Sequence, residues 1–246
     1  MIEYKNLVKK FGDRIILKGI SLQIAKGEIV FILGTSGTGK SVLLKNTVGL
    51  LWPDAGEVWI DGEEISRFSE EQYLKIRKKC GMVFQHPALF DSLTVFENVA
   101  FGLRRHFQYS EEVIQQKVTQ ALHLVQLVGI EKKFPAQISY GMQKRVSLAR
   151  TIAIEPQILL FDEPTTGLDP VTTNAVNNLI KELSKKLQTT SVVVSHDMNC
   201  ALAIADRIVV LDKGEIMAVG TPGELKKSTH PLVKDFLAEV SVGSVL

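Results

Sequence analysis

The fold of this 246-residue chain is decided by the stretch Gly34-Thr35-Ser36-Gly37-Thr38-Gly39-Lys40-Ser41. The stretch fits the phosphate-binding pattern G-x-x-x-x-G-K-[ST] without a mismatch. Apolar and β-branched residues at 28–33 precede it, as in a strand buried on both faces, and residues 41–50 after it have helical character. A strand, a glycine-rich loop and a helix N-terminus together direct backbone N–H groups at an anion, and the helix dipole adds to the attraction. The stretch therefore predicts a site for a phosphate group.

The residue types in this loop suit that chemistry. Gly34, Gly37 and Gly39 permit backbone angles and a close approach to phosphate that a Cβ atom would block. The Lys40 ammonium can reach the β- and γ-phosphates of a nucleotide, and the Ser41 hydroxyl can ligate Mg²⁺. A chance glycine-rich turn is the alternative, but the strand before the loop and the helix after it weigh against that interpretation. The predicted nucleotide contacts are Gly34, Thr35, Ser36, Gly37, Thr38, Gly39, Lys40 and Ser41.

The composition is that of an ordinary globular chain, with 45% hydrophobic and 23% charged residues and a net charge of +2. The length suits one large domain or two small ones. Basic pairs such as Lys9-Lys10 and Arg104-Arg105 are interleaved with acidic residues, so we expect no nucleic-acid surface. The two cysteines, Cys80 and Cys200, are far apart and lack the spacing of metal ligands, which favours packing roles in a reducing compartment.

The sequence also indicates how the chain relates to membranes. Charged residues occur throughout the first twenty residues of the chain, so we expect no secretory signal peptide. No uninterrupted apolar run approaches the roughly 18 residues that a membrane-spanning helix needs. We therefore expect any link to a membrane to pass through a partner protein.

Apolar patterning alternates between strand and helix periods along the chain. Two antiparallel strands are expected over residues 2–25, and a further hairpin follows Pro53-Asp54-Ala55-Gly56. The expected helices cover residues 69–79, 92–103, 110–128, 140–155 and 171–187, and the other expected strands residues 28–33, 81–84, 157–161, 191–195, 207–211 and 215–219. Buried strands that alternate with helices indicate a parallel sheet. We therefore predict an α/β fold with a mostly parallel sheet and an antiparallel edge at the N-terminus.

Two acids, Asp162 and Glu163, end the apolar run that begins at Ile158. Ligands bind at the carboxyl ends of parallel strands, where the first acid can hold Mg²⁺ through water. The second acid can orient or deprotonate an attacking water. Such a pair often only starts a turn, but a phosphate loop in the same chain favours the catalytic interpretation.

Two further polar residues follow expected strands. Gln85 comes after the strand at 81–84, where it either ligates Mg²⁺ or is solvated surface. His196 comes after the strand at 191–195, where it either polarises a γ-phosphate and holds the attacking water or has a structural role.

Ser139 opens the expected helix at 140–155. The ordinary interpretation is an N-cap serine. The alternative is a second anion site, made of the serine hydroxyl and the helix N-terminus. One chain would then carry two phosphate-binding surfaces, at 34–41 and 139–143, which suits two chains arranged head to tail, each covering the nucleotide of the other.

Together these motifs resemble those of the ABC (ATP-binding cassette) ATPases, over nearly the whole chain. The matches are Phe11 with the aromatic residue that stacks on adenine, residues 34–41 with the Walker A loop, Gln85 with the Q-loop, Ser139 and Gly141 with the signature, Asp162 and Glu163 with the Walker B acids, Asp169 with the D-loop and His196 with the switch histidine. The resemblance implies a P-loop NTPase with a mostly parallel central sheet, an antiparallel N-terminal β-subdomain and an inserted α-helical subdomain. It also implies an ATPase that binds ATP and Mg²⁺ at a seam between two copies.

The resemblance assigns roles to these residues. The implied catalytic residues are Glu163, His196 and Lys40. The implied metal ligands are Ser41, Gln85 and Asp162. The implied division is a nucleotide-binding core with the β-subdomain at 1–85 and 155–220, a helical subdomain at 86–154 and a tail at 221–246. Apolar residues at helical spacing after His230 suit a short amphipathic helix, which packs either on its own domain or on a neighbouring subunit.

The signature departs from the family pattern L-S-G-G-Q, because it reads Ile138-Ser139-Tyr140-Gly141-Met142. Ser139 and Gly141 keep the contacts that the family makes to the γ-phosphate of the opposing copy. Tyr140 places a bulky ring where the family has glycine. We therefore expect an active ATPase in which Tyr140 either slows closure of the dimer or alters its seam.

Residues 84–103, with Met142 in the signature, look most similar to the ATPases of Mla/MCE phospholipid transporters. This resemblance implies permease subunits docked on residues 86–103, together with MCE-domain and small regulatory subunits, at the cytoplasmic face of the inner membrane. The apolar residues of this segment either form the docking groove or are plain helix core. They are Leu89, Phe90, Leu93 and Phe96.

Three other functions compete with phospholipid transport. The first is an ATPase for another imported solute, such as an amino acid or a metal. The second is a soluble ABC ATPase that serves no transporter, as in iron–sulfur assembly. A DNA-repair ATPase is disfavoured, because it would need a long coiled-coil insertion where only about 50 residues separate Gln85 from the signature.

Overall fold

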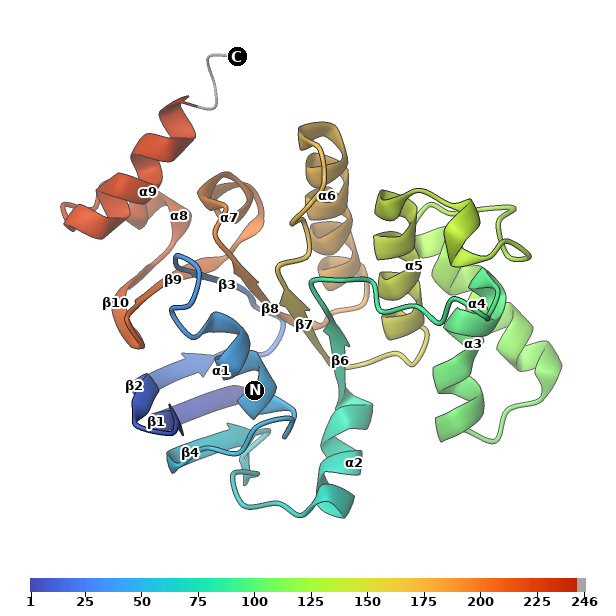
Figure 1. Cartoon of the computed structure of the whole chain (residues 1–246), viewed down its shortest axis with the longest axis horizontal. Helices are drawn as coiled ribbons and strands as arrows, with labels where there is room; N and C mark the ends of the chain where they lie inside the picture. Colours follow the sequence, from blue (N-terminus) through green and yellow to red (C-terminus); the bar gives the residue numbers. More distant parts are fainter. Residues whose placement is uncertain (243–246) are drawn as a thin grey trace. The chain divides into compact units, whose positions relative to one another are not determined.

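The computed structural model describes residues 1–242, which fall into two compact units. Unit 1 comprises Met1–Arg77 and the residues from Thr189 onward, and unit 2 comprises Lys78–Gln188. Figure 1 follows the chain from the blue strands of the N-terminus, through the green and yellow helices of unit 2, to the orange and red elements of unit 1. The predicted division, with a helical subdomain at residues 86–154, stays a prediction.

An antiparallel sheet with the strand order β2-β1-β4-β5 forms the first part of unit 1 (Figure 1). Its strands are β1 (Ile2–Phe11), β2 (Arg14–Ile24), β4 (Ala55–Ile60) and β5 (Glu63–Glu64). Successive side chains of a strand point to opposite faces. Ile2 and Tyr4 are accordingly buried, whereas Glu3 between them is not. The sheet confirms the predicted antiparallel region at the N-terminus.

A second group of strands in unit 1 is mostly parallel. β3 (Ile29–Leu33) pairs in parallel with β8 (Thr190–Ser195) and with β9 (Arg207–Asp212), while β10 (Glu215–Gly220) pairs antiparallel with β9. Every residue of β3 and β8 is buried, which explains their continuous apolar runs. After β3 the chain turns through the glycine-rich loop into α1 (Lys40–Thr47).

Three helices near the C-terminus complete unit 1: α7 (Met198–Ile204), α8 (Pro222–Leu225) and α9 (Pro231–Val242). The sequence analysis did not foresee α7 or α8. Side chains of Asp197 and Thr221 cap their first turns. Helix α9 confirms the expected tail helix, and it packs on its own unit, because Val233 and Phe236 are buried and α9 contacts α7. Residues 243–246 of the expected tail lie outside the described residues.

Unit 2 combines a parallel strand pair with long helices. The elements are β6 (Cys80–Val83), β7 (Ile158–Asp162), α3 (Val95–His106), α4 (Glu111–Leu124), α5 (Tyr140–Ile152), α6 (Pro170–Lys186) and a short 3-10 helix at Pro135–Gln137. Helices α3, α4 and α5 contact one another, as the green and yellow elements of Figure 1 show, and α5 packs on β6. At Gly81 in β6 a Cβ atom would overlap the Thr151 methyl group of α5, so this close packing requires glycine.

Several helix boundaries differ from the predicted ones, three of them for clear local reasons. Helix α3 begins at Val95 rather than at residue 92, because Thr94 and Glu97 form a capping box. Helix α4 ends at Leu124 rather than at 128, and Gln126 takes a left-handed φ of 58° just beyond it. Helix α5 ends at Ile152 rather than at 155, and Glu155 has a φ of 54° before Pro156. Over residues 1–242, no helix combines the length and the apolar character needed to span a bilayer.

Tyr73 anchors α2 (Glu70–Lys79) in unit 1. Its side chain is fully buried, with the ring edge-on to Trp52 and Phe68, and its hydroxyl donates to the Ile65 carbonyl oxygen at 2.8 Å. The ring lies directly against Gly49, where a Cβ atom would stand 2.5 Å from three ring carbons. Burial raises the pKa of the Tyr73 phenol to about 12, because the apolar surroundings disfavour the phenolate.

We expect Tyr73→Phe to lower the free energy of unfolding by about 1 kcal/mol at neutral pH, because the Ile65 carbonyl loses its donor. The difference should shrink and then change sign between about pH 10 and pH 12. In that range the unfolded wild type loses the Tyr73 proton while the folded chain keeps it, so wild-type stability falls with rising pH, and the phenylalanine variant lacks this loss. Urea unfolding followed by circular dichroism at several pH values measures both effects.

Tyr109→Phe is the matched control, because the Tyr109 side chain is 38% exposed. It should leave stability unchanged at both ends of the pH range. A Tyr73→Phe difference that stays constant up to pH 12 would show that Tyr73 does not titrate as its burial requires.

Candidate functional site

The loop between β3 and α1 is folded around its own lysine. The Lys40 ammonium donates to the carbonyl oxygens of Gly34 at 2.8 Å and of Thr35 at 3.1 Å. The Thr38 hydroxyl donates to the same Thr35 oxygen at 3.0 Å. Lys40 and Thr38 are each only 6% exposed. The loop therefore holds a concave backbone with a cation at its base, which suits a phosphate group.

Glycine is required at particular positions of this loop. A Cβ atom at Gly34 would overlap the Leu211 carbonyl oxygen and would stand 2.6 Å from the Thr38 hydroxyl. Gly39 has a φ of 106°, and a Cβ atom there would stand 2.7 Å from a Leu17 methyl group. Gly37 has a φ of 80°, which L side chains rarely adopt. The positive φ of Gly37 and Gly39 confirms the predicted backbone angles, whereas the crowding at Gly34 and Gly39 comes from the chain's own atoms.

Strand register brings His196 to the same edge of unit 1 as the loop. Leu33 of β3 lies opposite Ser195 of β8, so Gly34 and His196 both follow directly from paired residues. His196 is exposed at this edge. Phe11, the last residue of β1, is 49% exposed, and the Lys9 ammonium lies 5.4 Å from its ring centroid.

A second edge in unit 2 gathers Gln85 and the two acids. Val83 of β6 lies opposite Phe161 of β7, so Gln85 and Glu163 each follow their paired residue by two positions. Asp162 is 6% exposed, Glu163 is half-buried and Gln85 is exposed. Parallel pairing therefore places the polar residues after β6 and β7 at a common edge, as predicted.

Glu163 has an unusual backbone. Its φ is 49°, a left-handed conformation that costs energy in a residue with a side chain. The Thr166 hydroxyl donates to a Glu163 carboxylate oxygen at 3.1 Å, and the Thr166 amide donates to the Glu163 carbonyl oxygen at 3.3 Å. The Lys144 ammonium donates to the Pro164 carbonyl oxygen at 3.0 Å. Both the backbone and the carboxylate of Glu163 are therefore held in place.

The segment from Ser139 to Gly141 starts α5. Ser139 is the N-cap, and its hydroxyl oxygen accepts from the Met142 amide at 3.3 Å, as the ordinary interpretation predicted. A Cβ atom at Gly141 would stand 3.0 Å from the Thr172 methyl group of α6. Tyr140 is 37% exposed, and its hydroxyl lies 3.4 Å from Nδ1 of His86. Unit 2 thus brings this segment next to the residue that follows Gln85.

Asp169 caps α6 in the same unit. Its carboxylate accepts from the amides of Val171 and Thr172 at 3.0 Å each, and from the Thr172 hydroxyl at 2.6 Å. These hydrogen bonds, those from Thr172 first, hold the pKa of Asp169 below its usual range. Val171, one residue into the helix, is 79% exposed. The predicted D-loop residue therefore has a structural role here as a cap.

The half-buried Arg150 and the buried Asn98 brace the segment after Gln85. The Arg150 guanidinium donates to the carbonyl oxygens of Ala88 at 2.8 Å and Pro87 at 3.2 Å. Burial lowers the pKa of Arg150 from its usual value. The fully buried Asn98 accepts from the Phe90 amide at 2.8 Å and donates to the Phe90 carbonyl oxygen at 3.0 Å. The segment is therefore a fixed part of the structure rather than a loose connection.

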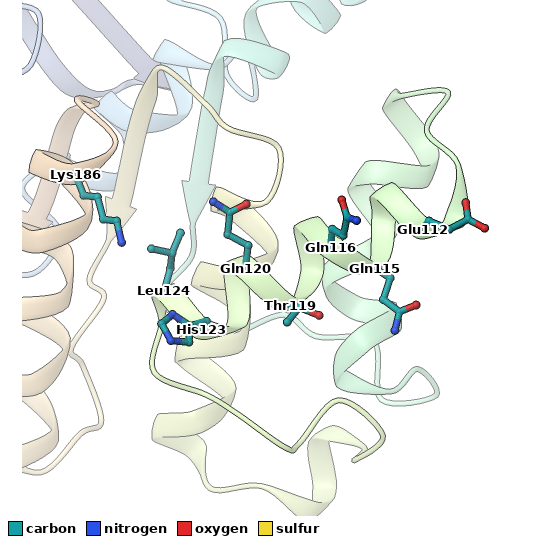
Figure 2. A pocket seen from close by; sticks show the side chains of 8 residues that line it. All are labelled: Glu112, Gln115, Gln116, Thr119, Gln120, His123, Leu124 and Lys186. Atoms are coloured by element: carbon teal, nitrogen blue, oxygen red, sulfur yellow. The ribbon is translucent and has the colours of Figure 1, made fainter.

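An open groove of about 710 Å³ lies along α4, away from these residues. Figure 2 shows its lining side chains, most of them polar and carried by α4. They are Glu112, Gln115, Gln116, Thr119, Gln120, His123, Leu124 and Lys186. None of the predicted site residues lines the groove, so its size alone does not mark it as the functional site.

Sequence reasoning missed Lys144 and the bracing contacts of Arg150. Lys144 lies one helical turn after Tyr140 and one turn before Leu148, which is buried. A basic residue on the apolar face of a predicted helix is a signal that could have found it, because a buried charge needs partners. Burial lowers the pKa of Lys144 to about 8, and the nearby Glu163 carboxylate opposes this shift.

Comparison with known proteins gives these motifs a family. Residues 17–166 match the family described as ABC transporter. The chain is 42% identical to the intermembrane phospholipid transport system ATP-binding protein MlaF of Haemophilus influenzae, over 100% of this chain and 93% of that protein. It is 43% identical to the sulfate/thiosulfate import ATP-binding protein CysA of Bradyrhizobium diazoefficiens, over 97% of this chain and 69% of that protein.

A solved structure supports the same assignment. The ATP-binding cassette MJ0796, in a dimeric post-hydrolysis state bound to ADP and Pi, is 36% identical with a TM-score of 0.83, over 90% of this chain and 99% of that one. This likeness confirms the predicted P-loop NTPase fold, and relatives of this kind bind ATP with Mg²⁺ and hydrolyse it to drive transport. The chain therefore belongs to the ABC transporter family, as an ATP-binding subunit that hydrolyses ATP.

Proposed function

We propose that the chain drives transport of phospholipid by membrane partners. The similarity to the phospholipid-transport relative, which extends over the whole chain, carries this proposal. The sulfate-import relative is as similar in percentage identity, so import of another solute is the second candidate. Substrate does not bind to the ATPase subunit in either case, so the choice depends on which membrane proteins it serves.

ATP hydrolysis would take place between two copies arranged head to tail. In this proposal ATP is bound by residues 34–41 and Phe11 of one copy, and by Ser139 and Gly141 of the other, with Asp169 at the seam. The concave backbone around Lys40 and the exposed segment at Tyr140 support it. The ADP-bound relative is itself dimeric. Closing the dimer would complete both sites at once.

The residues proposed for Mg²⁺ have suitable chemistry. Ser41, Gln85 and Asp162 offer hydroxyl, amide and carboxylate oxygens, which Mg²⁺ prefers. Among the described residues there is no cluster of three or more His, Cys, Asp or Glu side chains able to hold a metal. Mg²⁺ usually keeps several waters and is bound by one or two carboxylates together with nucleotide phosphates. When bound, Mg²⁺ would neutralise charge that develops on the phosphates.

Glu163 and His196 are the proposed residues for water attack. Glu163 would accept a proton from the attacking water, and His196 would hold that water or the γ-phosphate. Lys40 would stabilise the negative charge on the transferred group. The braced carboxylate of Glu163 supports this role, because a general base works only in a fixed position.

Residues 86–103 are the proposed docking surface for a permease at the cytoplasmic face of the membrane. The rings of Phe90 and Phe101 lie 4.7 Å apart and are 43% and 46% exposed, with half-buried Leu93 in the same segment. Leu89 and Phe96 are also half-buried. The segment therefore combines features of a docking groove with those of a plain helix core. Exposed aromatic rings on a braced segment suit a protein interface. MCE-domain and small regulatory subunits belong to the same proposal.

We expect Glu163→Gln to lower kcat about 10²- to 10⁴-fold while ATP still binds, because only the proton acceptor is lost. The variant should accumulate as an ATP-dependent dimer in size-exclusion chromatography with light scattering. Lys40→Ala should instead lose ATP binding. Glu155→Gln is the matched control, because Glu155 is an exposed partner of Lys117, and it should hydrolyse ATP normally. Hydrolysis by Glu163→Gln at the wild-type rate would remove Glu163 from this role.

The membrane partner is tested by affinity purification of the tagged chain from its native membrane in mild detergent, with proteins and lipids identified. A permease with an MCE-domain protein and phospholipid would support the proposal. A permease with a solute-binding protein would favour the importer. Soluble partners alone would contradict a transport role.

We expect Phe101→Glu to abolish co-purification of the permease, because a charge replaces an apolar contact, while ATP binding and melting temperature stay unchanged. Val128→Glu is the control, since Val128 is 75% exposed outside the segment, and it should keep the permease. Retention of the permease by Phe101→Glu would place the docking surface elsewhere.

A further inference from the structure

Lys144 is a buried charge with no role in the proposed mechanism so far. Its side chain is 5% exposed, and it lines a small apolar cavity together with Phe161, Pro164 and Val176. An ammonium group in such surroundings is strongly disfavoured unless its protons are hydrogen-bonded. The hydrogen bonds of Lys144 therefore explain why a charged side chain is tolerated at this buried position.

The ammonium of Lys144 binds two consecutive backbone carbonyl groups, those of Glu163 and Pro164. It donates to the Pro164 carbonyl oxygen at 3.0 Å and, more weakly, to the Glu163 carbonyl oxygen at 3.5 Å. The ring centroid of Tyr140 lies 5.5 Å from the same nitrogen, within the range of a cation–π contact. The charge thus connects α5 to the segment that follows β7.

That segment needs such support. Residues before proline favour extended backbone, yet Glu163, which precedes Pro164, has a φ of 49°. Strained backbone of this kind persists only where the surroundings enforce it. Thr166 holds the Glu163 carboxylate from one side, and Lys144 holds the two carbonyl groups from the other.

We propose that Lys144 is a positioning residue for ATP hydrolysis, which fixes the backbone of Glu163 and Pro164 so that the Glu163 carboxylate keeps one orientation. Lys144 lies on α5, the helix that Ser139 caps and whose first turn includes Gly141. It therefore also couples the orientation of the Glu163 carboxylate to that helix. A shift of α5 on contact with ATP would then move Glu163 with it. The inference rests on the proposed role of Glu163 as the proton acceptor.

The test compares three variants of the full chain in steady-state ATPase assays, with ATP affinity and melting temperature measured in parallel. Lys144→Met keeps the aliphatic stem and removes the donors, whereas Lys144→Arg keeps a charged donor. Lys185→Met is the control, because it removes an exposed lysine of α6 in the same unit.

We expect Lys144→Met to lower kcat about ten- to a hundredfold, the usual value of a hydrogen bond from a charged donor. KM and affinity for ATP should stay within about twofold, and the melting temperature within about 3 °C, since the lost bonds hold the catalytic segment rather than the fold. Lys144→Arg should recover most of the wild-type kcat, and Lys185→Met should match the wild type.

Two results would overturn the inference. One is a normal kcat for Lys144→Met in a chain that Glu163→Gln inactivates, which would leave the proposed function intact. The other is a fall in kcat that accompanies an equal fall in melting temperature and is not recovered by arginine, which would make Lys144 structural only. Normal hydrolysis by Glu163→Gln would instead contradict the proposed function itself.

Discussion

Parallel strand register is the constraint on which the site depends. Leu33 lies opposite Ser195, and Val83 lies opposite Phe161, so the residues that follow each pair emerge at one edge of their unit. The strands are buried and mostly apolar up to their carboxyl ends, where β7 closes on Asp162. The phosphate loop and His196 in unit 1, and Gln85 with the acids in unit 2, therefore occupy the strand ends, where ligands of α/β folds bind.

Buried or half-buried cations hold the backbone that these edges expose. Lys40 bonds the carbonyl groups of Gly34 and Thr35, Lys144 bonds that of Pro164, and Arg150 bonds those of Pro87 and Ala88. Each of these cations binds loop carbonyls, so contacts within the chain itself hold the loops in place. ATP hydrolysis gains mostly from positioning and electrostatics, and such fixing lowers the reorganisation that the reaction needs.

Local chemistry explains what the sequence could predict. The strand runs, and the positions of the glycine-rich loop and the acids at strand ends, could be predicted because these patterns are short and their causes local. The roles of the site residues stay predictions. Helix ends were less accurate, because left-handed residues such as Gln126 and Glu155 carry no composition signal. Lys144 was missed because its partners are backbone carbonyls about twenty residues away, and no side-chain pattern marks them. The short helix α7 was missed because it spans only Met198–Ile204, too few residues for a clear period.

Phospholipid movement is the most specific part of the proposed function, and reconstitution tests it most directly. The chain would be purified with its membrane partners, placed in lipid vesicles with a fluorescent phospholipid, and supplied with Mg²⁺ and ATP. We expect ATP-dependent movement of the labelled phospholipid at a rate that follows ATP hydrolysis, with none when Glu163→Gln replaces the wild type. ATP hydrolysis without lipid movement, together with uptake of sulfate or an amino acid by the same vesicles, would contradict phospholipid transport and leave the ATPase itself unaffected.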